Sequence, residues 1–446
     1  MNPVFRLFYV LYRAGAALKH WSRRRFTKAG LFVAGGFLVS GSVGTDVENT
    51  VVYEAFALLL GLLLLALAGS WFFRGEFSIT RSLPRFGTAG ERLRYRVRVT
   101  NRGRRIQKDL TLLENLVDPR PSFKEWIGFQ RAEGRGRWFR TKPLRRKHPF
   151  RMAWVKEAAM PALAANGEGE TEVELLPYRR GILRLTGTTL ARSDPMGLFR
   201  SFVHVKAPQT VSILPRRYPL GAVALPGTMK YQEGGVAQAS NVGRSDEFVS
   251  LRDYRRGDPV RYIHWRSWAK AGKPIVKEFE DEFFVRHALV LDTFTDNPRS
   301  ELLEEAISVA ASFACEVVTQ ESLLDLLFVG AQSYCFTAGR SLGGTEQMLE
   351  ILAAVGGCTR GSFVALEELV LRHIGAVSGC ICVLLDWDGP RQQLVRKLME
   401  IGVPTLVLVV TDGAGKKPEP GPMREAPERF WVLDVGQIGE QLAALK

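Results

Sequence analysis

The chain contains little cysteine and histidine, with five Cys and six His among 446 residues. All five cysteines fall in the last third, and none is spaced as Cys-x-x-Cys. This distribution favours reduced, mostly buried thiols in a cytosolic compartment. Cys380 and Cys382 alternate with Ile381 inside an apolar run, so we expect a core strand there and not a metal or redox site.

Common enzyme motifs are also scarce. The chain lacks the phosphate-binding pattern G-x-x-x-x-G-K-[ST] and the zinc-protease pattern H-E-x-x-H, so nucleotide hydrolysis and zinc proteolysis have no motif here. Hydrolase-type acyl transfer is not expected either, and we predict no catalytic residues and no enzyme activity. The scattered His and Cys residues leave a Cys–His nucleophile pair open.

Acidic residues are too few to balance the basic ones: 46 Asp and Glu face 61 Lys and Arg, which gives a net charge of +15. Such a chain can meet nucleic acid, an anionic membrane surface or an acidic partner. The densest basic stretch, residues 131–156, mixes Lys and Arg with Trp138, Phe139, Phe150 and Trp154. Because this mixture suits both base stacking and lipid headgroups, three interpretations stay open: a nucleic-acid binder, an anionic-lipid binder and a solvated loop.

Lys and Arg are absent from one short loop, and the pattern around it indicates a membrane hairpin. Uncharged apolar runs at about residues 29–45 and 55–73 flank the acids Asp46 and Glu48. Each run approaches the roughly 20 residues needed to span a bilayer. Lys and Arg residues are concentrated before the first run and after the second. The positive-inside rule therefore places both termini in the cytoplasm. A cleavable signal peptide is the competing interpretation of the first run.

Two folded regions are predicted from periodicity. Between residues 76 and 215, Leu93, Tyr95, Val97 and Val99 alternate with arginines. This period of two predicts a half-buried strand and, with similar runs downstream, a small antiparallel sandwich. From residue 286 to residue 446, apolar strands alternate with helical periodicity. That order predicts a parallel sheet covered by helices, with any ligand site at the carboxyl ends of its strands.

The segment that organises the chain lies within residues 216–285. Its charged and aromatic residues are interleaved too densely for a helix face or a half-buried strand, so we expect an ion-pair network and a tight turn at 256–259. The run from Phe248 to Lys273 and the acidic-aromatic residues 278–282 resemble the signature of the bacterial domain-of-unknown-function family 58, DUF58. The signature residues expected to build a structural network or to touch a partner are Arg252, Tyr254, Gly257, Asp258, Arg261, His264, Trp265, Glu278 and Glu280.

Two further resemblances extend along the chain. The hexapeptide Asp194-Pro195-Met196-Gly197-Leu198-Phe199 resembles a second signature of the same family, usually D-P-F-G-L-F. The C-terminal region resembles a von Willebrand factor A-type domain, a class that binds Mg²⁺ through D-x-S-x-S, a Thr and a second Asp. The candidate ligands here are Asp292, Thr345 and Asp386. Phe294 supplies no oxygen where the first Ser belongs, so we expect a degenerate site without metal, and Mg²⁺ binding is the alternative.

The predicted fold class is a two-helix membrane anchor plus an all-β sandwich-like domain plus an α/β parallel-sheet domain of the von Willebrand factor A type, divided at about 1–75, 76–215, 216–285 and 286–446. The family resemblance implies a non-enzymatic scaffold or adaptor in the bacterial inner membrane, multi-pass, with its main domains in the cytoplasm. Proteins of this kind are partnered with MoxR-type AAA+ ATPases and sometimes with transglutaminase-like membrane proteins, in complex assembly or a chaperone-like role. The alternatives are a Mg²⁺-dependent ligand-binding or sensing module and a binder of nucleic acid or anionic lipid through residues 131–156. No cofactor is expected, and the oligomeric state is left open.

Overall fold

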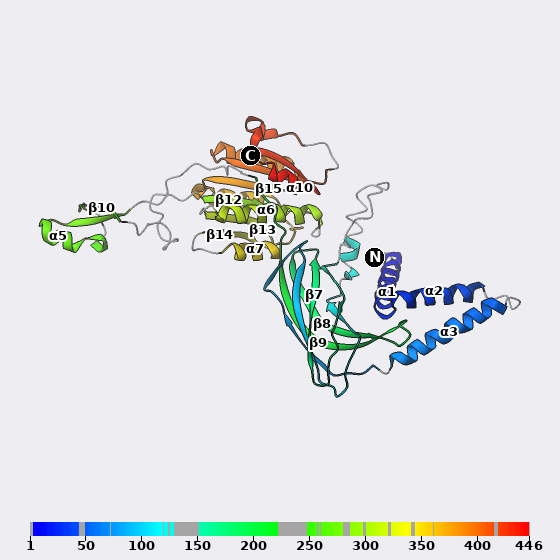
Figure 1. Cartoon of the computed structure of the whole chain (residues 1–446). Coiled ribbons are helices and arrows are strands. Elements are labelled where there is room, and N and C mark those ends of the chain that lie inside the picture. The colour runs from blue at the N-terminus through cyan, green and yellow to red at the C-terminus, as the bar shows by residue number, and fades with distance from the viewer. Residues whose placement is uncertain are drawn as a thin grey trace. The chain divides into compact units, whose positions relative to one another are not determined.

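The computed structural model of the chain (Figure 1) describes residues 3–43, 50–71, 73–118, 120–123, 125–128, 151–221, 248–256, 258, 260–279, 286–297, 300–319, 323–339, 344–359, 361–413 and 418–445. The chain divides into two compact units. The first comprises residues 1–216 with 349–355, and the second comprises 217–348 with 356–446. The predicted mixture of helices and several β-sheets is confirmed.

The first unit begins with the helices α1 (Pro3–Arg25), α2 (Lys28–Val43) and α3 (Thr50–Ser70). Of the helices within the described residues, only α3, over Val51–Ser70, is long and apolar enough to cross a membrane. Helix α2 is apolar but has 16 residues. At a rise of 1.5 Å per residue it is about 24 Å long, short of the roughly 30 Å hydrocarbon layer.

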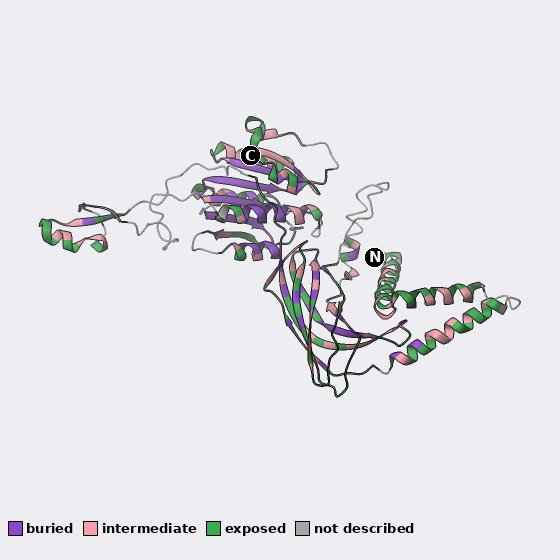
Figure 2. Ribbon diagram, viewed as in Figure 1, coloured by how far each residue is buried: buried purple, intermediate pink, exposed green. Residues whose placement is uncertain are grey.

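Small residues of α2 lie against α3, as the apolar pattern predicts. A Cβ atom on Gly36 would lie 3.4 Å from Leu59, and one on Gly41 would lie 3.2 Å from Phe56. Phe37 also stacks on Phe56, with ring centroids 4.8 Å apart. The other side chains of both helices are mostly exposed (Figure 2). The two helices therefore pack on each other and leave apolar outer faces.

One boundary and one whole helix of this region differ from the sequence-based expectation. The second apolar run was predicted to extend to Phe73, but α3 ends at Ser70 and Phe73 is buried in the core of the following β-sheets. Hydropathy alone does not distinguish these environments, because both are apolar. Helix α1 was not predicted at all, since its bases were interpreted only as flanks of the membrane hairpin.

Two sheets follow α3 and enclose one core. The strands are β1 (Phe77–Ser82), β2 (Phe86–Thr88), β3 (Leu93–Asn101), β4 (Leu110–Leu116), β5 (Ala153–Val155), β6 (Ala158–Ala159), β7 (Glu168–Pro177), β8 (Gly181–Ser193) and β9 (Arg200–Leu214). One sheet has the order β1-β3-β7-β5 and the other β2-β9-β8-β4-β6. Val97 and Val173 of the first sheet share a buried cluster with Leu112 and Ile213 of the second. The alternation predicted for β3 is confirmed, because its valines are buried and its arginines are exposed.

The second unit contains a short hairpin and a larger α/β sheet, whose helix α7 is shared with the first unit from Leu349 onward. The hairpin consists of β10 (Phe248–Asp253), the 3-10 turn η1 (Val260–Tyr262), α5 (Trp265–Ala271) and β11 (Ile275–Phe279). The α/β part consists of β12 (Arg286–Leu291), α6 (Glu301–Thr319), β13 (Leu323–Val329), β14 (Ser333–Ala338), α7 (Thr345–Ala354), α8 (Val364–His373), η2 (Ile374–Ala376), β15 (Gly379–Leu384), α9 (Gly389–Glu400), β16 (Thr405–Thr411), η3 (Gly421–Glu425), η4 (Pro427–Arg429), β17 (Phe430–Asp434) and α10 (Ile438–Ala443). Helix α8 and strand β14 were not predicted.

The larger sheet has the strand order β14-β13-β12-β15-β16-β17. All neighbouring pairs are parallel except β13 with β14. Its central strands are buried along their whole length (Figure 2), which explains their nearly continuous apolar sequence. Cys380 and Cys382 are buried in β15 with their sulfur atoms 3.6 Å apart, so the predicted core position is confirmed.

Candidate functional site

The DUF58-like signature folds as a strand pair and a helix, so the expectation that it is neither helix nor strand was wrong. Strands β10 and β11 pair antiparallel, with Arg252 opposite Val276. Ile263 forms a further bridge to Val276, which is the buried side chain of this segment. Because so small an element has almost no core, its strands need no apolar periodicity. The density of charge therefore did not exclude regular structure.

A two-pronged ion pair braces the turn after β10. Arg252 donates from both terminal nitrogens to the two carboxylate oxygens of Asp258, at 2.7 and 2.8 Å. The Arg255 N–H donates to the same carboxylate at 2.8 Å, and the Asp258 N–H donates to the Arg255 carbonyl at 3.0 Å. Hydrogen bonds from Arg252 and from the Arg255 backbone lower the pKa of Asp258 from 3.8 to about 2. Arg252 and Asp258 are thus parts of the segment's own architecture.

His264 organises the start of α5. Its ring Nδ1 lies 2.7 Å from the Ser267 hydroxyl, and its carbonyl accepts hydrogen bonds from the N–H groups of Ser267 and Trp268. Its own N–H donates to the Ile275 carbonyl at 2.8 Å, which ties α5 to β11. These contacts give His264 a structural role in the hairpin.

Aromatic and basic side chains form the outer face of α5. Trp265 stacks on Trp268 with centroids 5.2 Å apart, and 61% of Trp265 is exposed. Arg266 and Lys270 are exposed on the same helix. The Arg261 guanidinium lies over the Tyr262 ring, 4.9 Å from its centroid. We call Trp265, Trp268, Arg266 and Lys270 the α5 face.

The remaining signature residues make fewer described side-chain contacts in the hairpin. Tyr254 is half-buried, and its N–H donates to the Pro274 carbonyl at 3.0 Å. Glu278 pairs with Ser250 through the backbone of β11, but its side chain lies outside the described part of the chain. Gly257 and Glu280 also lie outside the described residues, as does most of the basic stretch, residues 131–150.

The second candidate site lies where the strand order of the larger sheet reverses, between β12 and β15. Ligands of open α/β sheets bind at such a switch point, outside the carboxyl ends of the strands. Asp292 follows β12 directly and is 0% exposed. Its carboxylate accepts hydrogen bonds from the N–H groups of Phe294 at 2.9 Å and Leu385 at 3.1 Å. It also accepts one from Arg391 Nε of α9 at 2.7 Å.

Arg391 places a positive charge beside this carboxylate. Its side chain is 9% exposed, and it also donates to Asp388 at 2.8 Å. Burial raises the pKa of Asp292, and the Arg391 guanidinium and both backbone donors act in the opposite direction. The Arg391 guanidinium is therefore the cationic partner of the buried Asp292 carboxylate.

The other two metal-ligand candidates lie at different elements. Thr345 begins α7, and the Asp386 carboxylate accepts from the N–H of its own neighbour, Trp387, at 2.7 Å. The Phe294 ring packs on Phe363, with centroids 5.8 Å apart, and offers no ligand atom. Among the described residues, no group of three or more His, Cys, Asp or Glu side chains is arranged to hold a metal ion.

The second family-like motif, residues 194–199, forms a turn at the base of the helices. The Asp194 carboxylate accepts hydrogen bonds from the N–H groups of Met196, Leu198 and Phe199 at 2.8, 2.8 and 2.5 Å. Gly197 has φ +68°, which explains a glycine at this position. The Thr27 hydroxyl donates to the Gly197 carbonyl at 2.6 Å. The Ser201 hydroxyl donates to the Ser70 carbonyl at 2.6 Å. The motif therefore fixes the start of α2, and the neighbouring Ser201 of β9 fixes the end of α3.

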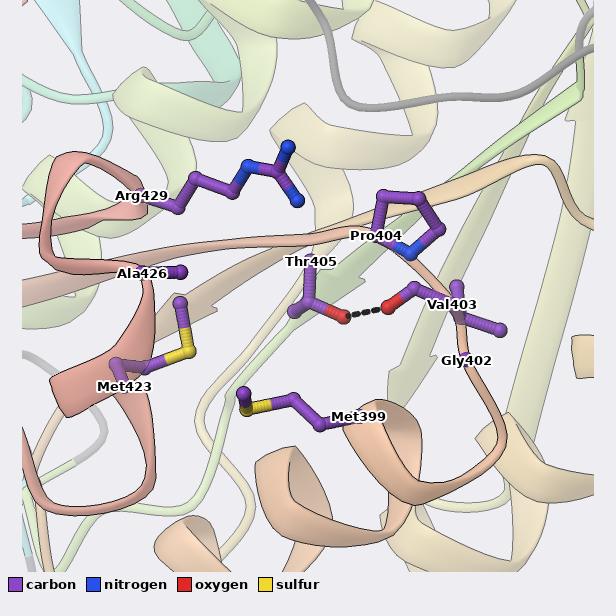
Figure 3. A pocket seen from close by; sticks show the side chains of 8 residues that line it. All are labelled: Met399, Gly402, Val403, Pro404, Thr405, Met423, Ala426 and Arg429. Carbon is purple, nitrogen blue, oxygen red and sulfur yellow. Dashed lines mark hydrogen bonds between the residues drawn. The ribbon is translucent and has the colours of Figure 1, made fainter.

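Two other features are not assigned to a site. A cavity of about 220 Å³ lies among Met399, Thr405, Met423 and Arg429 (Figure 3), at the amino end of β16 and away from the carboxyl edge. It is smaller than the roughly 300 Å³ typical of small-molecule sites. Residues 339–343 read G-x-S-x-G, a hydrolase motif that the sequence analysis overlooked. They follow the antiparallel edge strand β14, and residues 340–343 lie outside the described part of the chain.

Comparisons with known proteins agree with the signature. Residues 250–414 match the family described as "Protein of unknown function DUF58". The chain is 24% identical over 235 residues to "Uncharacterized protein YeaD" of Bacillus subtilis (strain 168), a match covering 48% of this chain. The chain spans 57% of the length of that curated relative. These two matches support the DUF58 resemblance.

Solved structures add little. The CARDB domain of the PF1109 protein from Pyrococcus furiosus, in complex with di-metal ions, is similar over 31% of this chain and 93% of its own. That similarity has 12% identity and a TM-score of 0.18. A beta-glucosidase from Listeria innocua is similar over 31% of this chain and 16% of its own, with 16% identity and a TM-score of 0.17. Scores this low do not identify a shared fold.

Proposed function

We propose that this chain is a membrane-anchored, non-enzymatic adaptor that binds a MoxR-type AAA+ ATPase through the α5 face. The DUF58 match, which contains the signature hairpin, and the apolar helix α3 support this proposal. The role would be complex assembly or a chaperone-like activity at the bacterial inner membrane.

The proposal rests on a difference between two groups of side chains in the hairpin: some are paired within it, and others are exposed. Arg252 and Asp258 are paired with each other, whereas Trp265 is 61% exposed and lies beside exposed cations. Exposed tryptophan and arginine side chains dominate the energetics of protein interfaces. The α5 face displays such residues without packing on a core, so it is suited to binding a partner protein. Its cations favour an acidic partner.

The finer architecture is part of the same proposal. Packing of α2 on α3 supports a two-span hairpin, and the surrounding bases favour cytoplasmic termini. The common core of the two β-sheets supports a sandwich. The strand order of the larger sheet, 3-2-1-4-5-6 in chain order with an antiparallel edge strand, supports a von Willebrand factor A-like domain.

The test is a crosslinked pull-down of the full-length protein from solubilised membranes. Trp265→Ala and Arg266→Glu alter the α5 face, and Ile182→Ala, at a residue 60% exposed in β8, is the matched surface control. We expect an AAA+ ATPase with wild type and with the control, and its loss with both α5 variants while the protein stays folded. Equal recovery from all four proteins would place docking elsewhere, and no ATPase from wild type would contradict the adaptor function.

A further inference from the structure

Helix α1 carries an apolar stripe that is not covered in the described structure. Leu7, Phe8, Leu11 and Leu18 lie on one side of the helix at 100° per residue. Their exposed fractions are 61, 57, 59 and 65%. We call these four residues the α1 stripe. Exposed leucines gathered on one helix face mark an interaction surface.

The opposite side of α1 is already occupied, so α1 has a defined orientation on its own unit. The Tyr9 hydroxyl donates to the Pro121 carbonyl at 2.8 Å. The Tyr9 ring contacts Phe123 with centroids 5.3 Å apart, and Tyr12 contacts Trp126 at 6.3 Å. These contacts leave the α1 stripe as the outward face.

The charge of α1 indicates an anionic neighbour. Its 23 residues include six Lys and Arg and no Asp or Glu. The exposed Lys19 borders the α1 stripe, about 20° from Phe8 around the helix axis, whereas Arg6 and Arg13 lie on the other side of the helix. Trp21, 49% exposed, lies near the basic end of the helix. An apolar face bordered by a lysine and an exposed tryptophan is typical of helices that lie in the interface of a bilayer.

The position of α1 along the chain supplies the second argument. Helix α1 ends at Arg25 and α2 begins at Lys28, with Thr27 hydrogen-bonded to the Gly197 carbonyl between them. Figure 1 shows that α1 does not continue the axis of α2. The carbonyl of Ser70, at the end of α3, accepts from Ser201 of the same β-sheet edge. The end of α1 therefore lies at the level where the candidate span emerges.

We propose that α1 is an interfacial helix whose α1 stripe binds the surface of an anionic phospholipid bilayer. This inference rests on the membrane anchoring proposed above and adds a second, peripheral contact to it. The stripe enters the boundary between headgroups and acyl chains, and Lys19 at its border lies among the anionic headgroups. The β-sheet unit is then held at a fixed distance from the bilayer by two contacts.

The experiment places an environment-sensitive fluorophore on single cysteines of the full-length protein in proteoliposomes. Cys335 and Cys315 are first replaced by Ala, because the other three native cysteines are buried. Probe sites are Leu11→Cys and Leu18→Cys, with the exposed Arg396→Cys of α9 as the aqueous control. The vesicles contain phosphatidylcholine alone or mixed with phosphatidylglycerol, and quenching by spin-labelled lipid is measured.

We expect several-fold stronger lipid quenching at both stripe positions than at the control, and a larger effect with phosphatidylglycerol. Lys19→Gln should weaken the phosphatidylglycerol effect, and Lys19→Arg should keep it. Quenching equal to the control would overturn the inference. Shielding that depends on protein concentration and not on lipid would also overturn it, because a second copy of the chain would then cover the stripe.

Alkaline extraction separates this inference from the anchoring on which it rests. If carbonate releases the protein from membranes, the membrane anchor is wrong. If the protein resists carbonate while the stripe probes remain aqueous, the anchor stands and the interfacial helix is wrong.

Discussion

Removing Arg391 tests whether an internal cation stabilises the switch point of the larger sheet. Asp292 is fully buried, and Arg391 is the cationic partner at 2.7 Å. In Arg391→Ala the carboxylate keeps its two backbone donors but loses its counter-charge. Breaking a buried ion pair by removing one partner costs about 3–5 kcal/mol.

Asp292→Asn should cost less, because Arg391 retains Asp388 at 2.8 Å. Loss of one charged hydrogen bond costs about 1.5–3 kcal/mol. The double variant should lose less stability than the sum of the losses in the two single variants. This follows because each charge destabilises the protein mainly when it stays buried without its partner. The matched control is Arg396→Ala, an exposed arginine on the same helix.

The assay is hydrogen exchange of the full-length protein, followed in peptides from β12, β15 and α9. A loss of about 3–5 kcal/mol in the free energy of local opening accelerates exchange by roughly two to four orders of magnitude. Mg²⁺ should leave the wild-type protection unchanged. A mild effect of Arg391→Ala, together with protection of wild type by Mg²⁺, would refute the reasoning and restore the metal-dependent alternative.

Three further changes test the hairpin and the base of the helices. The pKa of Asp258, lowered from 3.8 to about 2, means that its stabilising pair is present above 3.8 and is lost as pH falls through about 2. Pepsin should therefore cleave the wild-type hairpin only when the pH approaches about 2. It should cleave the hairpin of Asp258→Asn at every pH between about 2 and 3.8. Asp194→Ala leaves three N–H groups without their acceptor and should cost about 2–4 kcal/mol, seen as a lower unfolding temperature. Gly30→Ala should disrupt the same turn, because its Cβ would lie 1.9 Å from the Leu198 carbonyl oxygen. Gly15→Ala, with open space around it, should be neutral or stabilising in the same assay.

The parts of the fold with a large core were predictable from sequence. Burial on one or both faces imposes periods and apolar runs, and these revealed β3 and the central strands β12, β13, β15 and β16. The hairpin of β10, α5 and β11 has little core, so its strands carry no such pattern. Strand β14 was not predicted for a related reason: its residues 333–335 are exposed, so they carry no apolar pattern.

The contacts that define the candidate sites join residues that are distant in sequence. Asp292 and Arg391 are 99 positions apart, and no spacing rule pairs them. The sequence did indicate that Asp292 ends a strand and that Phe294 supplies no oxygen. It could not show that an arginine of α9 lies beside that carboxylate. Likewise the motif at 194–199 was noticed as a resemblance, and only the structure connects its turn to Thr27 and the neighbouring Ser201 to Ser70.

The most direct test of the adaptor function is photocrosslinking in intact membranes from a photoreactive amino acid at residue 265. The same amino acid at Ile401, a residue 52% exposed after α9, is the control. The proposal predicts an adduct with an AAA+ ATPase from residue 265 and none from residue 401. An ATPase adduct from residue 401 alone, or adducts of equal yield from both sites, would contradict docking through the α5 face. No ATPase adduct from either site would contradict the partnership itself.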